Sequence, residues 1–597
     1  MKKTLWILLV LCLLLSGCTA KETKTSEAAP ETVPQNETTG DALPDTEEFS
    51  YAFSPHVMAE EYKKIYGPGI EDVFYTFCDT VLEAGDSFAC ADREELFHLL
   101  TIAKSCFPLA DGLVDREQSY VENGTAHLVY KNDPQEVREL AERFISKVES
   151  VIRSAIPCET ADWIKAVELM TAVARKTVPD EEYTLEDSLS LSPYRAITED
   201  TGICQEIAGE YIYYLLQVGI DAIPCGGLSS DQSFAHEWVL VKLDGKWYHV
   251  DPMFAASYPD SLFFFGMTDR QREHYGDLPP EGYDYAYSDM LKREDFEATD
   301  TRFLDLWLAE SYTIDQERQT IHMTETREDD SMPKIEKLYN DEFSMRYFRF
   351  GNGGKTFVML PGLSITSVMD SAAAVADAYQ VFGGDYTVYL FDRRSDLPEN
   401  YTIADMAGDT AKAFELLDLN DICLFGASQG GMIAMTIAAE YPDRIRKLVL
   451  GSTACRVSEE AEKGVGEWAK LAEEGKAEEL VFGFAKLVYP EAVYKQSEPL
   501  LKAMAQTVTA EDLARFVILS SATKGFDVSD KLQQIRCPVL VLGAKDDAVL
   551  GPEAVEELIG KLEGNPGLQS YIYDGFGHAA YDLAPDYKDR MLAFFKD

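Results

Sequence analysis

The stretch ICLFGASQGGMIAM, residues 422–435, decides the fold of the C-terminal part of the chain. It begins with an apolar run, as in a buried β-strand, and the apolar residues from Met432 onward continue at helical spacing. Between them, Gly426, Ser428 and Gly430 form the pattern Gly-x-Ser-x-Gly. In the order strand, pattern, helix, the glycines permit a sharp turn that lifts a serine hydroxyl clear of the sheet. We therefore expect Ser428 to be a nucleophile at the end of a strand.

The segments around Ser428 predict a mostly parallel sheet. From about residue 340 to 597, strand-like and helix-like segments alternate, which is typical of βαβ units. Upstream, the run FVML at 357–360 leads into PGLS, and the run YTVYLF at 386–391 leads into DRR. Together with the serine turn, these segments resemble the α/β-hydrolase family, whose fold is a doubly wound, mostly parallel sheet.

The resemblance implies an oxyanion hole. Two backbone N–H groups bind the developing oxyanion in this family, and here they would belong to Leu363 and Gln429. The family usually has His-Gly where this chain has Pro361-Gly362. Because the donors are backbone groups, the hole tolerates that substitution.

Two later strand ends complete a serine triad under the same resemblance. The run VLVLGAKDDAV at 539–549 ends in acids, and the run YIYDGFGHA at 571–579 ends in a histidine. The order Ser, Asp, His is that of this fold, and His578 matches the general base. The acid is Asp547 or Asp546, and we prefer Asp547 because it begins the sequence Asp-x-Val-Leu, as in the family. The alternative is that both acids are solvated loop charges and His578 is a turn residue.

A charge-rich helical insertion interrupts the alternation at about 456–532. It follows the strand-like run LVL at 448–450, where α/β-hydrolases carry a cap. The resemblance implies that this cap shapes an acyl pocket and limits the access of water.

The middle of the chain contains a candidate thiol nucleophile in the stretch DTGICQEIAGE, residues 200–210. Asp200 or Thr201 can cap a helix there, and later apolar residues form the buried face of that helix. Cys204 would then lie in the first helical turn, where the helix dipole favours the nucleophilic thiolate. The alternative is that Cys204 is a small buried core residue, as most lone cysteines are.

A hairpin downstream supplies acid–base partners for this thiol. The dipeptide Asp-Gly at 244–245 separates the runs AHEWVLVKL and KWYHVDP and predicts a two-residue turn. In the register that this turn sets, His236 and Asp251 are diagonal neighbours on one sheet face, within reach of each other. The same register puts His249 on that face, so spacing alone does not choose between the two histidines.

The stretches GICQEIA, AHEW and GKWYHVDP resemble the transglutaminase-like superfamily of papain-like thiol enzymes, over about residues 185–275. The resemblance implies that Cys204 is the nucleophile, His236 the general base and Asp251 the acid that orients the histidine. It places His249 at a framework position. Glu237 departs from the family, which often has a small residue there, and this could alter the pocket.

The N-terminus indicates export and lipid attachment. Two lysines precede an apolar run at 5–15 that is too short to span a bilayer, and Leu-Ser-Gly-Cys follows. This tetrapeptide resembles a bacterial lipobox, which implies a signal peptide at 1–17 and a lipid on Cys18. A plain cleaved signal or an uncleaved anchor is the alternative. Residues 18–50 are polar and predict a flexible acidic stalk, so the protein would be anchored to the cell membrane on its extracytoplasmic side.

The chain of 597 residues is too long for one ordinary core. Its pattern predicts a helical region at 51–150, an α+β transglutaminase-like domain at 151–320, a polar linker at 321–339 and the α/β-hydrolase domain at 340–597.

Composition excludes some classes of partner. The chain has 54 Lys and Arg against 104 Asp and Glu, a net charge of −50, which repels nucleic-acid backbones. Its 11 cysteines show no zinc spacing, although one or two pairs could bridge in an oxidising exterior. No phosphate loop or dinucleotide fingerprint appears. We therefore expect no nucleic acid, no metal and no cofactor.

Two hypotheses for function follow. In the first, the protein is an enzyme whose thiol site cleaves amide bonds in peptide or cell-envelope substrates and whose serine site cleaves esters or related acyl bonds in small molecules. Members of the thiol family include cross-linkers as well, but hydrolysis is favoured because no lysine-accepting groove can be identified. In the second, one or both sites are inactive and the protein binds or scaffolds surface molecules. The intact triads favour the enzyme.

Overall fold

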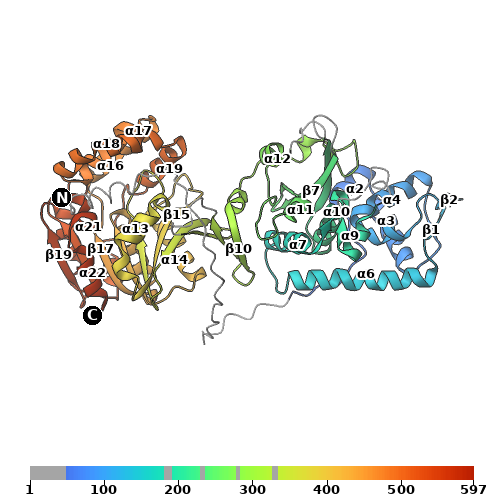
Figure 1. The fold of residues 1–597 in the computed structure, drawn as a ribbon, viewed down its shortest axis with the longest axis horizontal. Coiled ribbons are helices and arrows are strands. Elements are labelled where there is room, and N and C mark those ends of the chain that lie inside the picture. Colours follow the sequence, from blue (N-terminus) through green and yellow to red (C-terminus); the bar gives the residue numbers. More distant parts are fainter. Residues whose placement is uncertain (1–48, 181–190, 229–234, 277–282, 326–333, 597) are drawn as a thin grey trace, which may run out of the picture. The chain divides into compact units, whose positions relative to one another are not determined.

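The computed structural model describes residues 49–180, 191–228, 235–276, 283–325 and 334–596 (Figure 1). The chain forms two compact units, one over residues 37–319 and one that contains residues 320–597. The predicted signal peptide, Cys18 and nearly all of the predicted stalk lie outside the described residues. Within the described ranges, no helix has the length and apolar character needed to cross a bilayer.

The N-terminal unit begins with helices. They are α2 (Glu60–Tyr66), α3 (Ile70–Leu82), α4 (Arg93–Cys106), α5 (Pro108–Leu113) and α6 (Pro134–Ala155), accompanied by a small sheet of β1 (Ser87–Ala89), β2 (Tyr120–Glu122) and β3 (Thr125–His127). In α6, the long helix at the lower side of this unit in Figure 1, Val137, Ala141, Phe144, Val148 and Ile152 are buried, a spacing that gives one apolar face. Because α6 runs across residue 150, the boundary predicted there separates no structural units.

The rest of this unit packs helices against an antiparallel sheet of order β8-β7-β6-β9. The helices are α7 (Asp162–Lys176), α9 (Pro193–Glu199), α10 (Cys204–Gln217), α11 (Pro252–Ala255), α12 (Asp269–Gly276), η2 (Arg293–Asp295) and η3 (Leu304–Leu308), and the strands are β4 (Val178–Pro179), β5 (Thr201–Gly202), β6 (Ala222–Leu228), β7 (Ala235–Leu243), β8 (Lys246–Val250), β9 (Asp284–Tyr285) and β10 (Ala309–Asp315). Every residue of α10 from Glu206 to Gln217 is buried, so this helix forms the centre of the unit.

The predicted hairpin forms between β7 and β8. Leu243 pairs with Lys246, as a two-residue turn requires. Asp244 and Gly245 have φ values of 50° and 77°, the left-handed conformations of a type I′ turn. Strand β8 ends one residue before Asp251, which caps α11. The Asp251 carboxylate therefore approaches the hairpin from a helix cap and not from the strand position that the register predicts.

The C-terminal unit is built on a mixed sheet. Its strands are β11 (Thr320–Glu325), β12 (Ile335–Tyr339), β13 (Ser344–Phe350), β14 (Lys355–Leu360), β15 (Tyr386–Arg394), β16 (Ile422–Ala427), β17 (Ile445–Gly451), β18 (Val539–Ala544) and β19 (Gln569–Tyr573). Within this unit the order is β11-β12-β13-β15-β14-β16-β17-β18-β19. Neighbouring strands are parallel from β15 to β19, and the pairings of β11, β12, β13 and β15 are antiparallel.

The linker predicted at 321–339 is wrong for its described parts. Ile321 of β11 pairs with Tyr339 of β12, and both strands belong to the sheet. Residues 326–333 lie outside the described residues. The segment looks polar because the buried apolar residues of β11, Ile321 and Met323, alternate with polar residues, of which His322 and Thr324 are partly exposed.

Helices cover both faces of this sheet. They are η4 (Val368–Ser371), α13 (Ala372–Ala378), η5 (Gln380–Phe382), α14 (Ile403–Leu416), α15 (Gln429–Glu440), η6 (Pro442–Arg444), η7 (Leu532–Gln534), α20 (Pro552–Leu562), η8 (Gly577–Ala579), α21 (Ala580–Leu583) and α22 (Tyr587–Lys596). One core cluster includes Phe414 and Ile433, and the other includes Phe382 and Phe595. Within 456–532, α16 (Glu459–Glu473), α17 (Ala477–Val488), α18 (Glu491–Thr507) and α19 (Ala510–Ser521) lie together in Figure 1 and share a further cluster around Trp468. We call these four helices the cap.

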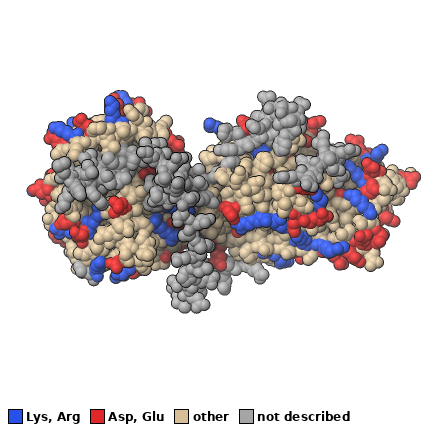
Figure 2. All heavy atoms as spheres, in the orientation of Figure 1, with Lys and Arg blue, Asp and Glu red and all other residues tan. Residues whose placement is uncertain are grey.

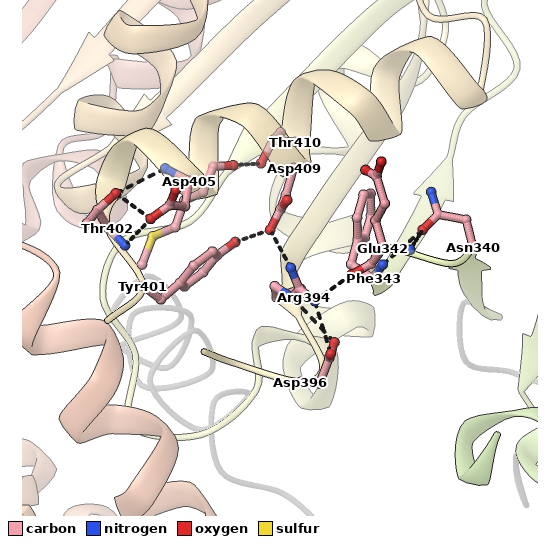
Figure 3. Close-up of polar contacts among 11 residues, drawn as sticks. Asn340, Glu342, Phe343, Arg394, Asp396, Tyr401, Thr402, Asp405, Asp409 and Thr410 are labelled. Carbon is pink, nitrogen blue, oxygen red and sulfur yellow. Dashed lines mark hydrogen bonds and ion pairs between the residues drawn. The ribbon is translucent and has the colours of Figure 1, made fainter. Parts of the chain in front are cut away.

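Arg394, the last residue of β15, fixes the exit of that strand (Figure 3). It donates hydrogen bonds to Asp396, to Asp409 of α14 and to the carbonyl oxygen of Glu342. Tyr401 donates to the same Asp409 carboxylate at 2.7 Å. These contacts tie the strand end to α14 and to the turn between β12 and β13, at the edge of the sheet where the serine turn lies.

The surface carries both signs of charge. On the face drawn in Figure 2, the described lysine and arginine side chains lie among acidic ones. Exposed ion pairs among the described residues include Lys495 with Glu491 and Arg536 with Asp443. Exposed pairs of this kind contribute about 0–1 kcal/mol each.

Candidate active sites

Ser428 lies in the turn between β16 and α15, where the sequence predicts it. Its φ and ψ are 52° and −120°, a left-handed conformation that costs a non-glycine residue about 1–3 kcal/mol. The surroundings hold it there. A Cβ on Gly430 would lie 2.1 Å from the carbonyl oxygen of Leu360, so only glycine lets β14 end this close to the turn. The Ser428 N–H donates to the Gly451 carbonyl oxygen at 2.9 Å.

His578 connects Ser428 to Asp547. Its Nε2 lies 2.9 Å from Ser428 Oγ, and its Nδ1 lies 2.8 Å from Asp547 Oδ2. The His578 and Asp547 side chains are both buried. They follow β19 and β18, and the carboxyl ends of parallel strands meet at one edge of a sheet, so residues far apart in the chain converge. With Nδ1–H donating to the carboxylate, Nε2 is free to accept the serine proton, which is the tautomer that a general base needs.

The two candidate acids have different partners. Asp546 accepts a hydrogen bond from the Gly577 N–H at 3.0 Å and so holds the loop of the histidine. Asp547 accepts, through Oδ1, from the N–H groups of Val549 and Leu550 at 2.9 and 3.0 Å. Burial raises the pKa of Asp547, but His578 and these hydrogen bonds outweigh burial and hold the pKa below its ordinary value. The contact with the histidine therefore belongs to Asp547.

Leu363 and Gln429 border a small pocket at Ser428, with a volume of about 40 Å³. Gln429 is the first residue of α15, so its N–H is one of the donors that a helix leaves unpaired. The buried Arg393 guanidinium donates to the Pro361 carbonyl oxygen at 2.7 Å and to Gln429 Oε1 at 3.3 Å. This arginine joins the loop that carries Leu363 to the helix that carries Gln429. In the sequence, Arg393 stands out only as part of a strand exit.

A buried ion pair joins the cap to the sheet. Asp392 of β15 accepts from Arg515 of α19 and from the Ser367 hydroxyl, both at 2.6 Å. Burial raises the pKa of Asp392, but Arg515, Ser367 and the Arg393 N–H together hold it below its ordinary value. The carboxylate therefore stays charged at neutral pH and holds α19 against the strand.

Cys204 is the first residue of α10, in the turn that the sequence predicts. It is partly exposed, whereas the other cysteines that the structure describes are free thiols and buried. The predicted cap, Asp200 or Thr201, is wrong: the N-cap residue is Ile203, and Asp200 ends α9 instead. The Glu206 carboxylate reaches back and accepts from the Ile203 N–H at 3.1 Å. An acid at this position satisfies the first donor of the helix, so no capping side chain is needed.

His236 meets Asp251 and interacts with Cys204. Its Nε2 lies 2.7 Å from Asp251 Oδ2. Burial lowers the pKa of His236, but the charge and hydrogen bond of Asp251, followed by a hydrogen bond and charge from Cys204, raise the pKa to about 9. The Phe254 ring stacks on the imidazole, with centroids 4.4 Å apart, and fixes its plane. The structure thus brings the three predicted thiol-site residues together.

Arg272 is a further member of this site, and sequence reasoning missed it. Its Nη1 lies 2.9 Å from Asp251 Oδ2, and both side chains are fully buried. The guanidinium lies over the Trp238 ring at 4.0 Å. Burial raises the pKa of Asp251, but His236, Arg272 and the Phe254 N–H hold it below its ordinary value. Arg272 therefore keeps the orienting carboxylate charged. It lies on α12, outside the three stretches that carry the resemblance, so no motif marks it.

Replacing Arg272 with methionine should lower the free energy of unfolding by about 3 kcal/mol, because it leaves the buried Asp251 carboxylate without its arginine partner. Chemical denaturation measures the change. Arg270→Met, at an exposed position of the same helix, is the matched control and should change stability by less than about 0.5 kcal/mol. Equal stability of the two variants would contradict the role given to Arg272.

His249 has a structural role, because both of its ring nitrogens form hydrogen bonds with neighbouring side chains. Its Nδ1 accepts from the Trp238 indole N–H at 2.8 Å, so its Nε2 carries the proton and donates to Asp269 at 2.9 Å. Both ring nitrogens are therefore occupied, which leaves His236 as the histidine beside the thiol. Glu237, the departure from the family, accepts from the Tyr287 hydroxyl at 3.0 Å, and burial raises the pKa of Glu237 to about 7.

No group of His, Cys, Asp and Glu side chains in the described part of the chain is arranged to hold a metal ion. The groups that the two sites offer for chemistry are side chains and backbone N–H groups.

Comparisons with known proteins agree with this division. The model of the transglutaminase-like superfamily matches residues 154–252, and the model of the hydrolase family described as serine aminopeptidase, S33, matches residues 399–582. The "Putative carbamate hydrolase RutD" of Rhizobium rhizogenes strain K84 is 24% identical over 251 residues, which cover 40% of this chain and 93% of that protein. The protein of the same name from Escherichia coli O81 is 26% identical over 220 residues, 36% of this chain and 82% of that protein.

Solved structures with a similar fold cover the C-terminal unit. The α/β hydrolase MGS-M2 from a deep-sea metagenome library is 20% identical and covers 44% of this chain and 97% of its own, with a TM-score of 0.39. The esterase of Exiguobacterium antarcticum is 19% identical and covers 43% of this chain and 97% of its own, with a TM-score of 0.36. The matches to the two family models show that the chain contains a transglutaminase-like domain and, C-terminal to it, an α/β-hydrolase domain.

Proposed function

We propose that the protein is a hydrolase with two separate nucleophiles, Ser428 for ester or related acyl bonds and Cys204 for amide bonds in peptides. One observation carries the proposal: Ser428 Oγ, His578 and Asp547 form a continuous hydrogen-bonded line with distances of 2.9 and 2.8 Å. A strained serine with a histidine at its hydroxyl and a carboxylate behind that histidine is the arrangement that activates an alcohol.

At the serine site, His578 Nε2 takes the Ser428 proton as Oγ attacks the carbonyl carbon of the substrate. The carbonyl oxygen becomes an oxyanion, and the N–H groups of Leu363 and Gln429 are the donors proposed to bind it. The imidazolium, stabilised by Asp547, then protonates the leaving group, and the acyl group stays on Oγ. A water molecule gives its proton to Nε2 and attacks the acyl carbon, which releases the acid and restores the serine.

At the thiol site, the Cys204 thiolate, paired with protonated His236, attacks the amide carbonyl carbon; His236 gives its proton to the amine that leaves and then takes a proton from the water that releases the acyl group from Cys204. The raised pKa of His236, about 9, supports this proposal because the imidazole then carries a proton at neutral pH and can give it to an amine leaving group. Asp251, held charged by Arg272, keeps the imidazolium in place. Hydrolysis by water, and not transfer to an amine, is the proposed outcome.

The similarity to proteins named carbamate hydrolases adds carbamates to the candidate substrates of Ser428. A carbamate carbonyl is attacked in the same way as an ester carbonyl, so the site needs no further group. We also propose that Cys18 carries a lipid and that both sites face the extracytoplasmic side of the cell membrane. The lipobox-like sequence before Cys18 supports this location.

Active-site labels test the two nucleophiles on the native protein. A fluorophosphonate should modify Ser428 and abolish hydrolysis of p-nitrophenyl acetate, and iodoacetamide should modify Cys204 first and leave that hydrolysis unchanged. Peptide mapping locates each label. In urea both selectivities should disappear, because they depend on the folded triads. A native protein that takes up neither label selectively would support the alternative, a binding protein with inactive sites.

A further inference from the structure

A second, larger pocket adjoins the serine site. Its volume is about 230 Å³, and it lies between the loop after β14, helix α13 and the cap helices α17 and α18. We call this pocket the chamber. Five residues line both the chamber and the small pocket of Ser428: Gly362, Leu363, Phe484, Val488 and Tyr581. An acyl group bound to Ser428 would therefore have the chamber directly beside it.

The largely apolar wall of this chamber includes one carboxylic acid, Asp582, and one amine, Lys588. Asp582 lies on α21, four residues after His578, and its carboxylate has no hydrogen-bond or ion-pair partner among the residues that the structure describes. The Lys588 ammonium lies 5.0 Å from the centre of the Tyr379 ring. Each group is close enough to shift the pKa of the other, but they form no ion pair within the described part of the chain.

Burial shifts the pKa of each group towards its uncharged form. It raises the pKa of Asp582 to about 6, although Lys588 and His578 lower it. It also lowers the pKa of Lys588, and Asp582 opposes that change. The chamber therefore contains one acidic and one basic side chain that form no ion pair with each other within the described part of the chain, so both keep hydrogen-bonding capacity.

The two groups discriminate among acyl chains by what each chain leaves unpaired. An apolar chain would remove water from both groups and replace it with nothing, which is unfavourable for buried ionised groups. A chain with a charged end would pair with one group and be repelled by the other. An uncharged amide end has an N–H for the carboxylate and a carbonyl oxygen for the ammonium, so it satisfies both.

We propose that the chamber selects acyl groups of medium length that end in an uncharged hydrogen-bonding group, with a primary amide as the best fit, and that Asp582 and Lys588 are its specificity-determining residues. This inference rests on the proposed esterase function of Ser428 and names the substrate class of that site.

The test compares p-nitrophenyl esters that differ only at the far end of the acyl chain. Butanoyl, hexanoyl and octanoyl esters are each made with a methyl, a primary amide, an ammonium or a carboxylate end. The intact protein should hydrolyse the best amide-ended ester at least about tenfold faster, as kcat/KM, than its methyl-ended counterpart. Both charged esters should be slower than the amide-ended ester.

Two variants then shift the preference in opposite directions. Asp582→Asn leaves Lys588 unbalanced and should make the carboxylate-ended ester the best of its length. Lys588→Met leaves the Asp582 carboxylate without a nearby positive charge, so the ammonium-ended ester should become the best substrate of its length. Asp589→Asn, at an exposed position next to Lys588, should keep the preference of the intact protein.

The outcomes separate this inference from the function on which it rests. If p-nitrophenyl acetate is hydrolysed and Ser428 is labelled, but methyl-ended esters are hydrolysed as fast as amide-ended ones, the specificity proposal is overturned and the esterase stands. The specificity proposal is likewise overturned if neither variant shifts the preference. If no ester is hydrolysed and Ser428 takes up no fluorophosphonate, the esterase proposal itself fails.

Discussion

Asp547→Asn should lower kcat for p-nitrophenyl ester hydrolysis by about 10⁴-fold, whereas Asp546→Asn should change it by less than about threefold. The reason lies in the partners of Asp547. Its Oδ1 accepts from two backbone N–H groups and its Oδ2 from His578. In the asparagine variant, the amide oxygen keeps the backbone bonds, so the amide N–H₂ group faces Nδ1. Nδ1 must then accept, the proton moves to Nε2, and Nε2 can no longer take the proton of Ser428.

Asp546→Asn is the matched control because it changes the neighbouring residue by the same atoms. The Asp546 carboxylate accepts only a bond from the Gly577 N–H among the contacts described for it, and an amide oxygen can accept that bond equally well. Initial rates with saturating ester, on variants with unchanged thermal unfolding, give the comparison. An equal loss in both variants, or a larger loss in Asp546→Asn, would contradict the assignment of Asp547 as the acid.

His236→Gln should slow the alkylation of Cys204 by iodoacetamide about 100-fold at pH 6, because the thiolate fraction of an ordinary cysteine is small at that pH. The raised pKa of His236, about 9, makes the imidazole a cation at pH 6. A cation beside the sulfur favours the thiolate, and glutamine supplies none. His249→Gln should leave the rate within about threefold, because His249 is committed to Trp238 and Asp269. Mass spectrometry of the Cys204 peptide measures both rates.

The same raised pKa sets the direction of a pH dependence. The pKa of His236 rises from 6.5 to about 9 in the folded protein. The stabilisation by its ion pair with Asp251 is therefore complete below the ordinary pKa and is lost as the pH rises through about 9.

If His249→Gln slowed the alkylation of Cys204 as much as His236→Gln, the choice between the two histidines would be wrong.

The parts of both sites that were predictable from sequence are those fixed by local geometry. The Asp-Gly turn admits one register, so the hairpin followed from the turn, whereas the contact between His236 and Asp251 also depends on the helix cap that Asp251 forms after β8. The glycines around Ser428 admit one kind of turn. Asp546 and Asp547 remained alternatives because they are adjacent at the end of one strand. What distinguishes them is which backbone N–H groups their carboxylates contact, and the sequence does not show how the following turn places those groups.

The elements that the sequence did not reveal depend on long-range contacts. Arg272 meets Asp251 through the placement of α12, and no spacing rule connects the two. Asp582 and Lys588 belong to no motif of the sequence, and they face a common pocket only because the fold brings their helices next to the cap. The linker prediction failed because a half-covered strand such as β11 has the composition of a loop.

Because of the ion pair between Asp392 and Arg515, moving α19 away from the sheet costs more free energy than moving the other cap helices. Swinging α19 outward would separate two opposite charges away from bulk solvent, which is an expensive movement. The chamber wall contributed by α17 and α18 includes Val481, Phe484 and Leu501, whose displacement breaks no such pair. We therefore expect a substrate to enter along the rim formed by α17 and α18, while the ion pair holds α19 against the sheet.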